Sequence, residues 1–226
     1  MTSPARPWRT GQCATAILGA CLLAGGCTPQ QQAQLRQAQA ARADDEQWMA
    51  GSDKPATPKT LHSAARVLAA QGRDAEAEAV LRKIVAQEPR YLPAYVDLAE
   101  IDVRRRQFDR ATATLTAGLK IAPGDPVLLN DLGMCWVLQG DHARALEMFT
   151  KAASASPNDS RYLGNMAMAL GMLGRYGEAL ALYEQILPRP DAHDNLAILC
   201  QARKDLDRAA RERARAAELR AVPEQK

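Results

Sequence analysis

Apolar side chains recur at a helical spacing through the second part of the chain. From residue 58 the pattern returns every 34 residues through four copies, and a fifth copy begins 30 residues after the start of the fourth. Spacings of three and four residues place such side chains on one face of a helix. Prolines at Pro89, Pro123 and Pro157 close the first three copies, because proline lacks the backbone N–H that a helix needs. A period of this length indicates paired helices stacked in series. We expect five copies, at residues 58–91, 92–125, 126–159, 160–189 and 190–223.

Two positions of the period hold only glycine or alanine. The eighth position is Ala65, Ala99, Gly133, Ala167 and Ala197, and the twentieth is Ala77, Ala111, Ala145, Ala179 and Ala209. Small residues at both positions indicate that the two helices of each copy cross closely, because larger side chains would hold the backbones apart. Glycine at position fifteen in three copies suits the turn between the helices.

Two copies depart from this pattern. The second copy has Arg106 at the turn position and Asp102 at a position that is aromatic in the third copy, so we expect its turn and its packing to be less regular. The fourth copy breaks early at residues 188–190, which read Pro-Arg-Pro. Because proline disfavours helix in the residue before it, the second helix of that copy should be shorter by about one turn.

Composition supports helices and weighs against other classes. Alanine, the best intrinsic helix former, makes up about a fifth of the 226 residues, and only 4% are aromatic. We therefore exclude a β-sandwich or β-barrel. The formal net charge of +3 is too balanced for a nucleic-acid-binding domain, so no nucleic acid partner is expected.

The repeated residues resemble the tetratricopeptide repeat. The third copy carries its signature most fully, with Leu132-Gly133 at positions seven and eight, Trp136 at eleven, Ala145 at twenty and Pro157 at thirty-two. The resemblance implies an all-α, right-handed superhelical solenoid of about five helix-turn-helix repeats. It also implies a concave groove lined by the first helix of each repeat, at positions 2, 5, 9, 12 and 13.

These groove positions change in character along the chain. In the first two repeats they are mostly polar or charged, and they include His62, Arg66, Val96, Glu100 and Arg104. In the third and fourth repeats they are richer in apolar side chains, and methionine adapts its shape to a partner. We expect a protein or peptide partner to contact Asn130, Met134, Val137, Arg161, Asn165, Met168 and Met172. In this hypothesis the amides of Asn130 and Asn165 bond to the partner backbone.

Two alternatives to the methionine groove stay open. Met134, Met168 and Met172 could belong to the core between repeats, or residues 31–50 could cover them. The lysine and asparagine array with which some members of the family bind a C-terminal carboxylate is absent, because Asp97 stands where an amide is needed.

The first 26 residues resemble a bacterial lipoprotein signal. Arg6 and Arg9 precede an uncharged apolar run at residues 13–26, which ends in Leu-Ala-Gly-Gly before Cys27. The resemblance implies cleavage before Cys27 and lipidation of its thiol. Cys21 follows a tighter form of the motif and is the second candidate, and a signal that is neither cleaved nor lipidated is the remaining alternative. Thr28 is not the aspartate that retains lipoproteins at the inner membrane in enteric bacteria, so we expect an outer membrane lipoprotein that faces the periplasm.

Residues 27–57 are rich in Gln, Ala, Pro and charged residues. This composition is typical of a tether, with a possible short helix at residues 31–50.

No residue pattern indicates catalysis, a metal or a cofactor. His62, His142 and His193 fall in different repeats without a carboxylate or cysteine at metal-ligand spacing, so we expect surface or groove positions for them. Cys135 and Cys200 lie two repeats apart, too far for a disulfide. We therefore expect a protein that is not an enzyme.

The combined features predict a lipid-anchored interaction scaffold in the bacterial cell envelope, which assists assembly of a pilus or secretion machine. The arrangement is similar to tight-adherence pilus assembly lipoproteins and type IV pilotins in architecture only. The alternative is an accessory repeat protein that docks a cell-wall enzyme.

Overall fold

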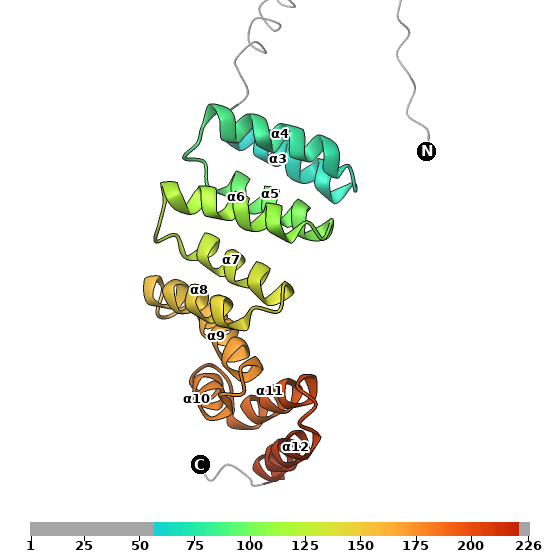
Figure 1. The fold of residues 1–226 in the computed structure, drawn as a ribbon, viewed down its shortest axis with the longest axis vertical. Helices are drawn as coiled ribbons and strands as arrows, with labels where there is room; N and C mark the ends of the chain where they lie inside the picture. Colours follow the sequence, from blue (N-terminus) through green and yellow to red (C-terminus); the bar gives the residue numbers. More distant parts are fainter. Residues whose placement is uncertain (1–56, 222–226) are drawn as a thin grey trace, which may run out of the picture. The chain divides into compact units, whose positions relative to one another are not determined.

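The structure, a computed structural model, describes residues 57–221. These residues form ten α-helices and, within this range, no strand (Figure 1). The helices form five consecutive pairs: α3 (Pro58–Ala70) and α4 (Asp74–Gln87), α5 (Pro93–Arg104) and α6 (Phe108–Ile121), α7 (Pro126–Leu138) and α8 (His142–Ala155), α9 (Ser160–Met172) and α10 (Tyr176–Ile186), and α11 (Arg189–Ala202) and α12 (Leu206–Ala221). The pairs stack in chain order, which confirms the predicted all-α solenoid. The predictions for Cys21, Cys27 and residues 31–50 concern parts of the chain outside the described residues.

The first helix of each pair (A) and the second (B) are joined by the same tight turn in all five repeats. Its central residue has a positive φ: 75° at Gly72, 80° at Gly140 and 81° at Gly174, but also 59° at Arg106 and 65° at Lys204. In the second repeat the Arg106 N–H donates to the Val103 carbonyl at 2.9 Å, as the Gly140 N–H donates to Val137 at 2.9 Å. The expectation of a less regular turn at Arg106 was therefore wrong, because arginine adopts the left-handed conformation there.

The two helices of each pair cross closely at the small residues. All five alanines at the twentieth position are at most 1% exposed, and Ala145 is completely buried. A Cβ atom added at Gly133 on α7 would lie 2.5 Å from the Phe149 ring on α8. The Phe149 ring therefore fills the space beside Gly133 and leaves no room for a larger side chain at this crossing.

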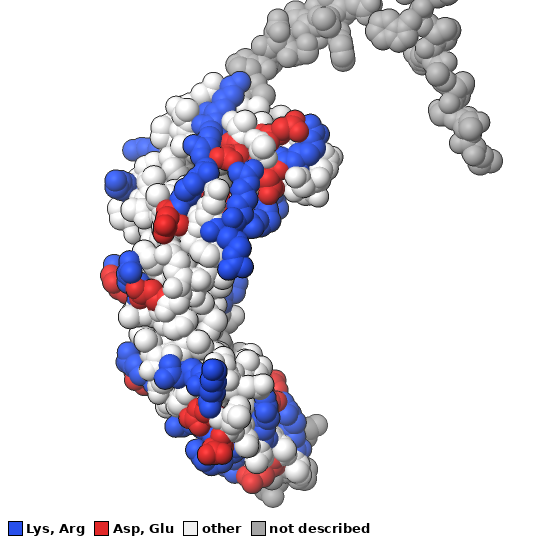
Figure 2. All heavy atoms as spheres, turned by 45° about the vertical axis from the view of Figure 1, so that its right-hand side comes forward, with Lys and Arg blue, Asp and Glu red and all other residues white. Residues whose placement is uncertain are grey.

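The A helices lie on the inner side of the curved stack. Those of repeats one and two, two and three, and four and five contact one another, whereas the B helices within residues 57–221 make their main contacts with A helices. Figure 2 shows the described part of the chain bending, with one side hollowed between the first and last repeats. The A helices of neighbouring repeats approach more closely than the B helices do, and this explains the curvature. The face of the A helices that points away from the B helices is therefore concave.

The fourth repeat is shortened at its B helix. Helix α10 has 11 residues, whereas α4, α6 and α8 each have 14. Pro188 is the N-cap of α11, so the chain turns directly into the fifth repeat. A Cβ atom added at Gly171 would lie 2.4 Å from Leu199, which shows how closely α9 and α11 pack here.

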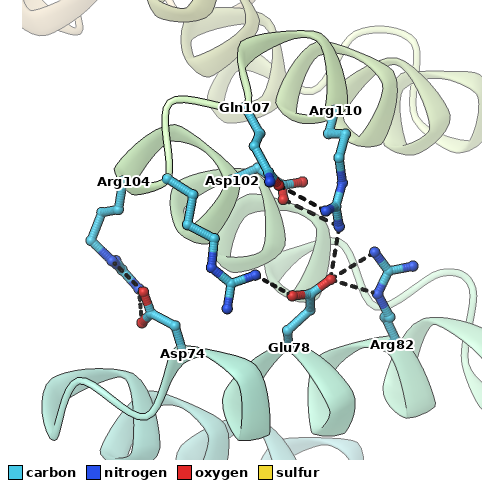
Figure 3. A network of polar contacts seen from close by, with 8 residues as sticks. Asp74, Glu78, Arg82, Asp102, Arg104, Gln107 and Arg110 are labelled. Carbon is cyan, nitrogen blue, oxygen red and sulfur yellow. Dashed lines mark hydrogen bonds and ion pairs between the residues drawn. The ribbon is translucent and has the colours of Figure 1, made fainter.

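A charged network joins the first repeat to the second (Figure 3). The Glu78 carboxylate on α4 accepts from Arg82 at 2.8 Å, Arg105 at 2.5 Å and Arg110 at 2.8 Å. Asp102, at the position where the third repeat has a tryptophan, is 3% exposed and lies 3.4 Å from Arg110. Burial raises the pKa of Asp102, whereas its arginine neighbours lower the pKa of Glu78 to about 2.

Candidate functional site

Three adjoining hollows lie along α3, α5 and α7 on the A-helix side. The largest, about 580 Å³, is the basic hollow: His62, Arg66, Arg90, Tyr91, Leu92, Pro93, Val96, Asp97, Asp125 and Val127. The apolar hollow, about 290 Å³, is lined by Val96, Ala99, Glu100, Val103, Leu115, Asp131, Met134, Cys135 and Leu138. A third hollow of about 210 Å³ shares Arg66 and Asp97 with the basic hollow and Glu100 with the apolar hollow. The shared residues make the three hollows one continuous surface over repeats one to three.

The two carboxylates of the basic hollow are already engaged. Asp97 lies 2.8 Å from Nε2 of His62, and the other ring nitrogen of His62 lies 3.2 Å from the Tyr91 hydroxyl. Asp125 is the N-cap of α7 and accepts from the backbone N–H groups of Val127 and Leu128. These bonds fix both acids at the wall of the hollow.

The arginines of the same hollow are not engaged in this way. Arg66 on α3 and Arg90 in the loop before α5 are both exposed, and neither forms an ion pair with any residue from 57 to 221. Two guanidinium groups therefore face a hollow whose own carboxylates have other partners.

The apolar hollow presents aliphatic and thioether side chains. Leu138 at the end of α7 is 48% exposed, whereas Met134 is half-buried. Cys135 is 2% exposed, and burial raises the pKa of its thiol to about 11, so the thiol stays protonated at neutral pH. The surface is suited to contact with an apolar side chain and not to nucleophilic chemistry.

A separate hollow of about 420 Å³ lies where the fourth repeat is shortened. This C-terminal hollow is lined by Ser160, Arg161, Gly164, Asn165, Met168, Tyr183, Ile186, Leu187, Asn195, Ile198 and Leu199. It shares no lining residue with the three hollows of repeats one to three. Ile198 on α11 is 59% exposed, and Arg161 bonds to Asp159 at 2.6 Å.

The residues predicted to form one groove are divided between these surfaces. Met134 lines the apolar hollow, while Arg161, Asn165 and Met168 line the C-terminal hollow. The remaining three, Asn130, Val137 and Met172, line none of the four hollows.

The amides and methionines that were predicted to contact a partner also interact with other residues of the chain. Asn165 donates to the side-chain oxygen of Asn130 at 2.7 Å, and Asn130 donates to Asp131 at 3.1 Å. Met134 and Met168 pack against the buried cluster of Ala145, Phe149 and Ala169, and Met172 packs against the cluster of Ala167, Tyr183, Ala192 and Leu199. The methionines thus belong in part to the core between repeats.

Sequence reasoning did not assign a binding role to Arg90, because this residue lies in a loop and outside the helical groove positions. It also placed His193 at the surface or in the groove, which was wrong. His193 is 7% exposed and lies 2.7 Å from Glu212 of α12, so it joins the two helices of the last repeat.

The part of the chain that the structure describes holds no group of three or more His, Cys, Asp or Glu residues placed to bind a metal ion. Within residues 57–221 no helix is both long and apolar enough to cross a membrane. Cys135 and Cys200 are both buried free thiols.

Two family models described as tetratricopeptide repeat match the chain, one over residues 63–130 and the other over residues 126–192. The chain belongs to the tetratricopeptide repeat family. Repeats of this family form protein–protein interaction scaffolds, so the chain is a scaffold of this type. Helix pairs that each contact only their neighbours build the extended concave surface that such scaffolds use.

The matches to curated relatives cover only part of each protein. The mouse (Mus musculus) Protein O-mannosyl-transferase TMTC1 is 29% identical over 130 residues, which are 54% of this chain and 14% of that protein. Human (Homo sapiens) Superkiller complex protein 3 is 32% identical over 85 residues, 38% of this chain and 5% of that protein. The Saccharomyces cerevisiae mitochondrial import receptor subunit TOM70 is 30% identical over 94 residues, 42% of this chain and 15% of that protein. The matches span at most 15% of these three relatives.

Solved structures share the fold. YrrB, described as a TPR protein with an unusual peptide-binding site, superposes with a TM-score of 0.58 at 19% identity, over 78% of this chain and 92% of that one. MamA superposes with a TM-score of 0.58 at 12% identity, over 71% of this chain and 90% of that one. At these identities the likeness concerns the arrangement of the helices.

Proposed function

We propose that this chain is a lipid-anchored scaffold of a bacterial cell envelope, which holds a segment of a partner protein against its A helices and assists assembly of a pilus or secretion machine. The observation that supports partner binding is the continuous surface over α3, α5 and α7. Val127 in the basic hollow and Leu138 in the apolar hollow are 43% and 48% exposed. A partner that covers these side chains removes apolar surface from water.

Similar proteins support a protein segment as the partner. YrrB carries a peptide-binding site by its description, and TOM70 is named as an import receptor subunit. YrrB superposes over 78% of this chain, so the shared fold extends over most of the helices that carry the three adjoining hollows.

The lipid anchor is supported by the sequence before Cys27. Palmitate labelling of the wild type and of Cys27→Ser in a bacterial host tests it. We expect the label in the wild type and in Cys21→Ser, and its loss in Cys27→Ser. Label retained in Cys27→Ser but lost in Cys21→Ser moves the anchor to Cys21, and an unlabelled wild type overturns the anchor.

A photo-crosslinking amino acid at Leu138 tests the scaffold function in the same host. The matched control is Ile121, an apolar residue at the end of α6 that is 38% exposed and lines none of the four hollows. We expect a crosslink at Leu138 to a component of a pilus or secretion machine, identified by mass spectrometry. A crosslink to a cell-wall hydrolase favours the accessory function, and equal crosslinking at Ile121 contradicts binding on the A-helix side.

A further inference from the structure

We propose that the partner segment has two unlike anchors: an Asp or Glu side chain that binds Arg66 and Arg90 in the basic hollow, and a large apolar side chain that enters the apolar hollow. This inference rests on the proposed function, and it states the chemistry of the partner. Its first anchor concerns Arg66 and Arg90, which lie outside the groove predicted over repeats three and four, and its second anchor shares only Met134 with the residues named for that groove.

The positive charges of Arg66 and Arg90 indicate an acidic side chain as the first anchor. The two acids of the basic hollow are held by His62 and by the N-terminus of α7, and within residues 57–221 no carboxylate forms an ion pair with Arg66 or Arg90. Guanidinium groups bind carboxylates through charge-assisted, often bidentate hydrogen bonds. An acidic side chain of the partner supplies the missing charge.

The apolar hollow adjoins the basic hollow, and this indicates an apolar side chain as the second anchor. Val96 lines both the basic and the apolar hollow, so a segment held in one extends directly over the other. An extended chain advances about 3.3 Å per residue, so a short segment reaches both of these adjoining hollows. We therefore expect the acidic and the apolar residue to be only a few positions apart in the partner, about three.

The charges around the apolar hollow set the order of the two anchors. Glu100 and Asp131 line the apolar hollow; Glu100 is exposed and pairs with Arg104 at 2.7 Å, whereas Asp131 accepts from the uncharged amide of Asn130 at 3.1 Å. A second acid on the partner would meet these carboxylates, and like charges in contact disfavour the wrong register. The acid must therefore lie in the basic hollow and the apolar residue in the apolar hollow.

The test is a phage-displayed library of random dodecapeptides, selected on the immobilised full chain in detergent. We expect enrichment of peptides with an Asp or Glu about three positions from Leu, Ile, Phe or Met. The best peptide is then synthesised with a fluorescein label, together with a version in which its acid is changed to the matching amide. Fluorescence anisotropy gives the dissociation constants.

The double variant R66Q/R90Q should bind the acidic peptide about tenfold more weakly, which is the effect of losing one charged hydrogen bond. It should bind the amide peptide as the wild type does. The control R211Q/R213Q removes two exposed arginines of α12 and should leave both constants unchanged. Circular dichroism checks that all variants are folded.

The outcomes distinguish failure of the two-anchor inference from failure of the proposed scaffold function. Enriched peptides that lack an acid, or an acidic peptide whose affinity is unchanged in R66Q/R90Q, overturn this inference and leave the scaffold function in place. Peptides whose binding is unaffected by Leu138→Glu overturn both, and so does a selection that enriches no peptide.

Discussion

A left-handed residue is needed at the turn of every repeat, and two repeats meet this need without glycine. Arg106 and Lys204 have φ values of 59° and 65°, where an L-residue is strained by about 1–2 kcal/mol. Glycine removes the strain but has more freedom in the unfolded chain, which offsets part of the gain. We expect Arg106→Gly to raise the free energy of unfolding by about 0.5–1 kcal/mol in urea denaturation.

The matched control is the turn of the third repeat. Gly140→Ala places a Cβ atom at a φ of 80° with no neighbouring atom within 4 Å, so only backbone strain changes. We expect this variant to lose about 1 kcal/mol. Equal stability of both variants with the wild type would contradict the strain at these turns.

At the scale of the helix pair, the crossing at position twenty limits the size of the side chain. Ala145 on α8 is completely buried, and Ala143 on the same helix is exposed. We expect Ala145→Leu to lower the free energy of unfolding by about 1–3 kcal/mol through overpacking. Ala143→Leu should change it by less than about 0.5 kcal/mol. A small change at Ala145 would contradict the assigned crossing.

The junction of the first two repeats should weaken in acid. The arginines around Glu78 lower its pKa from 4.5 to about 2, and its side chain is only 16% exposed. The unfolded chain therefore takes up this proton at a higher pH than the folded chain does. The stabilisation is complete above about pH 4.5 and is lost as the pH falls toward 2.

Replacement of Glu78 tests this pH dependence. Between pH 5.5 and pH 3 we expect the wild type to lose about 1–2 kcal/mol more stability than Glu78→Gln, because solvent screens Arg82 and Arg110 in part. Asp102 is present in both proteins and its raised pKa, which comes first from burial, has the opposite effect; loss of the Glu78 charge lowers the pKa of Asp102 in the variant. Parallel pH profiles of the two proteins would show that the network does not stabilise the junction.

The sequence allowed prediction of those elements that depend on local rules. Small residues at two fixed positions and prolines at the end of each period indicate helix pairs, and the Pro-Arg-Pro break indicates the short α10, which ends at Ile186. The turn at Arg106 was mispredicted because its conformation is imposed by the packing of α5 against α6 and not by its own preference. Asp102 is similar, since only the structure shows it buried beside Arg110.

At the scale of the whole molecule, the groove positions could be predicted but their grouping could not. The resemblance to the tetratricopeptide repeat implies which residues of each A helix face the concave side, and Met134, Asn165 and Met168 do line hollows. The grouping depends on the rotation between repeats, which separates the surface over α3, α5 and α7 from the C-terminal hollow. Arg90 adds to the first surface from a loop, where no helical period applies.

Because the predicted groove residues are divided between two surfaces and the core, replacing all three methionines is expected to change the stability of the fold. Met134, Met168 and Met172 are half-buried and pack against two core clusters that span repeats three to five. A glutamate at each position would lose apolar burial and bring a charge against apolar neighbours. We expect the triple variant to lose about 2–5 kcal/mol of unfolding free energy, measured by circular dichroism in urea. Leu138→Glu, at a position that is 48% exposed, should melt like the wild type and still lose the partner. A triple variant that melts like the wild type would instead assign all three methionines to an open binding surface.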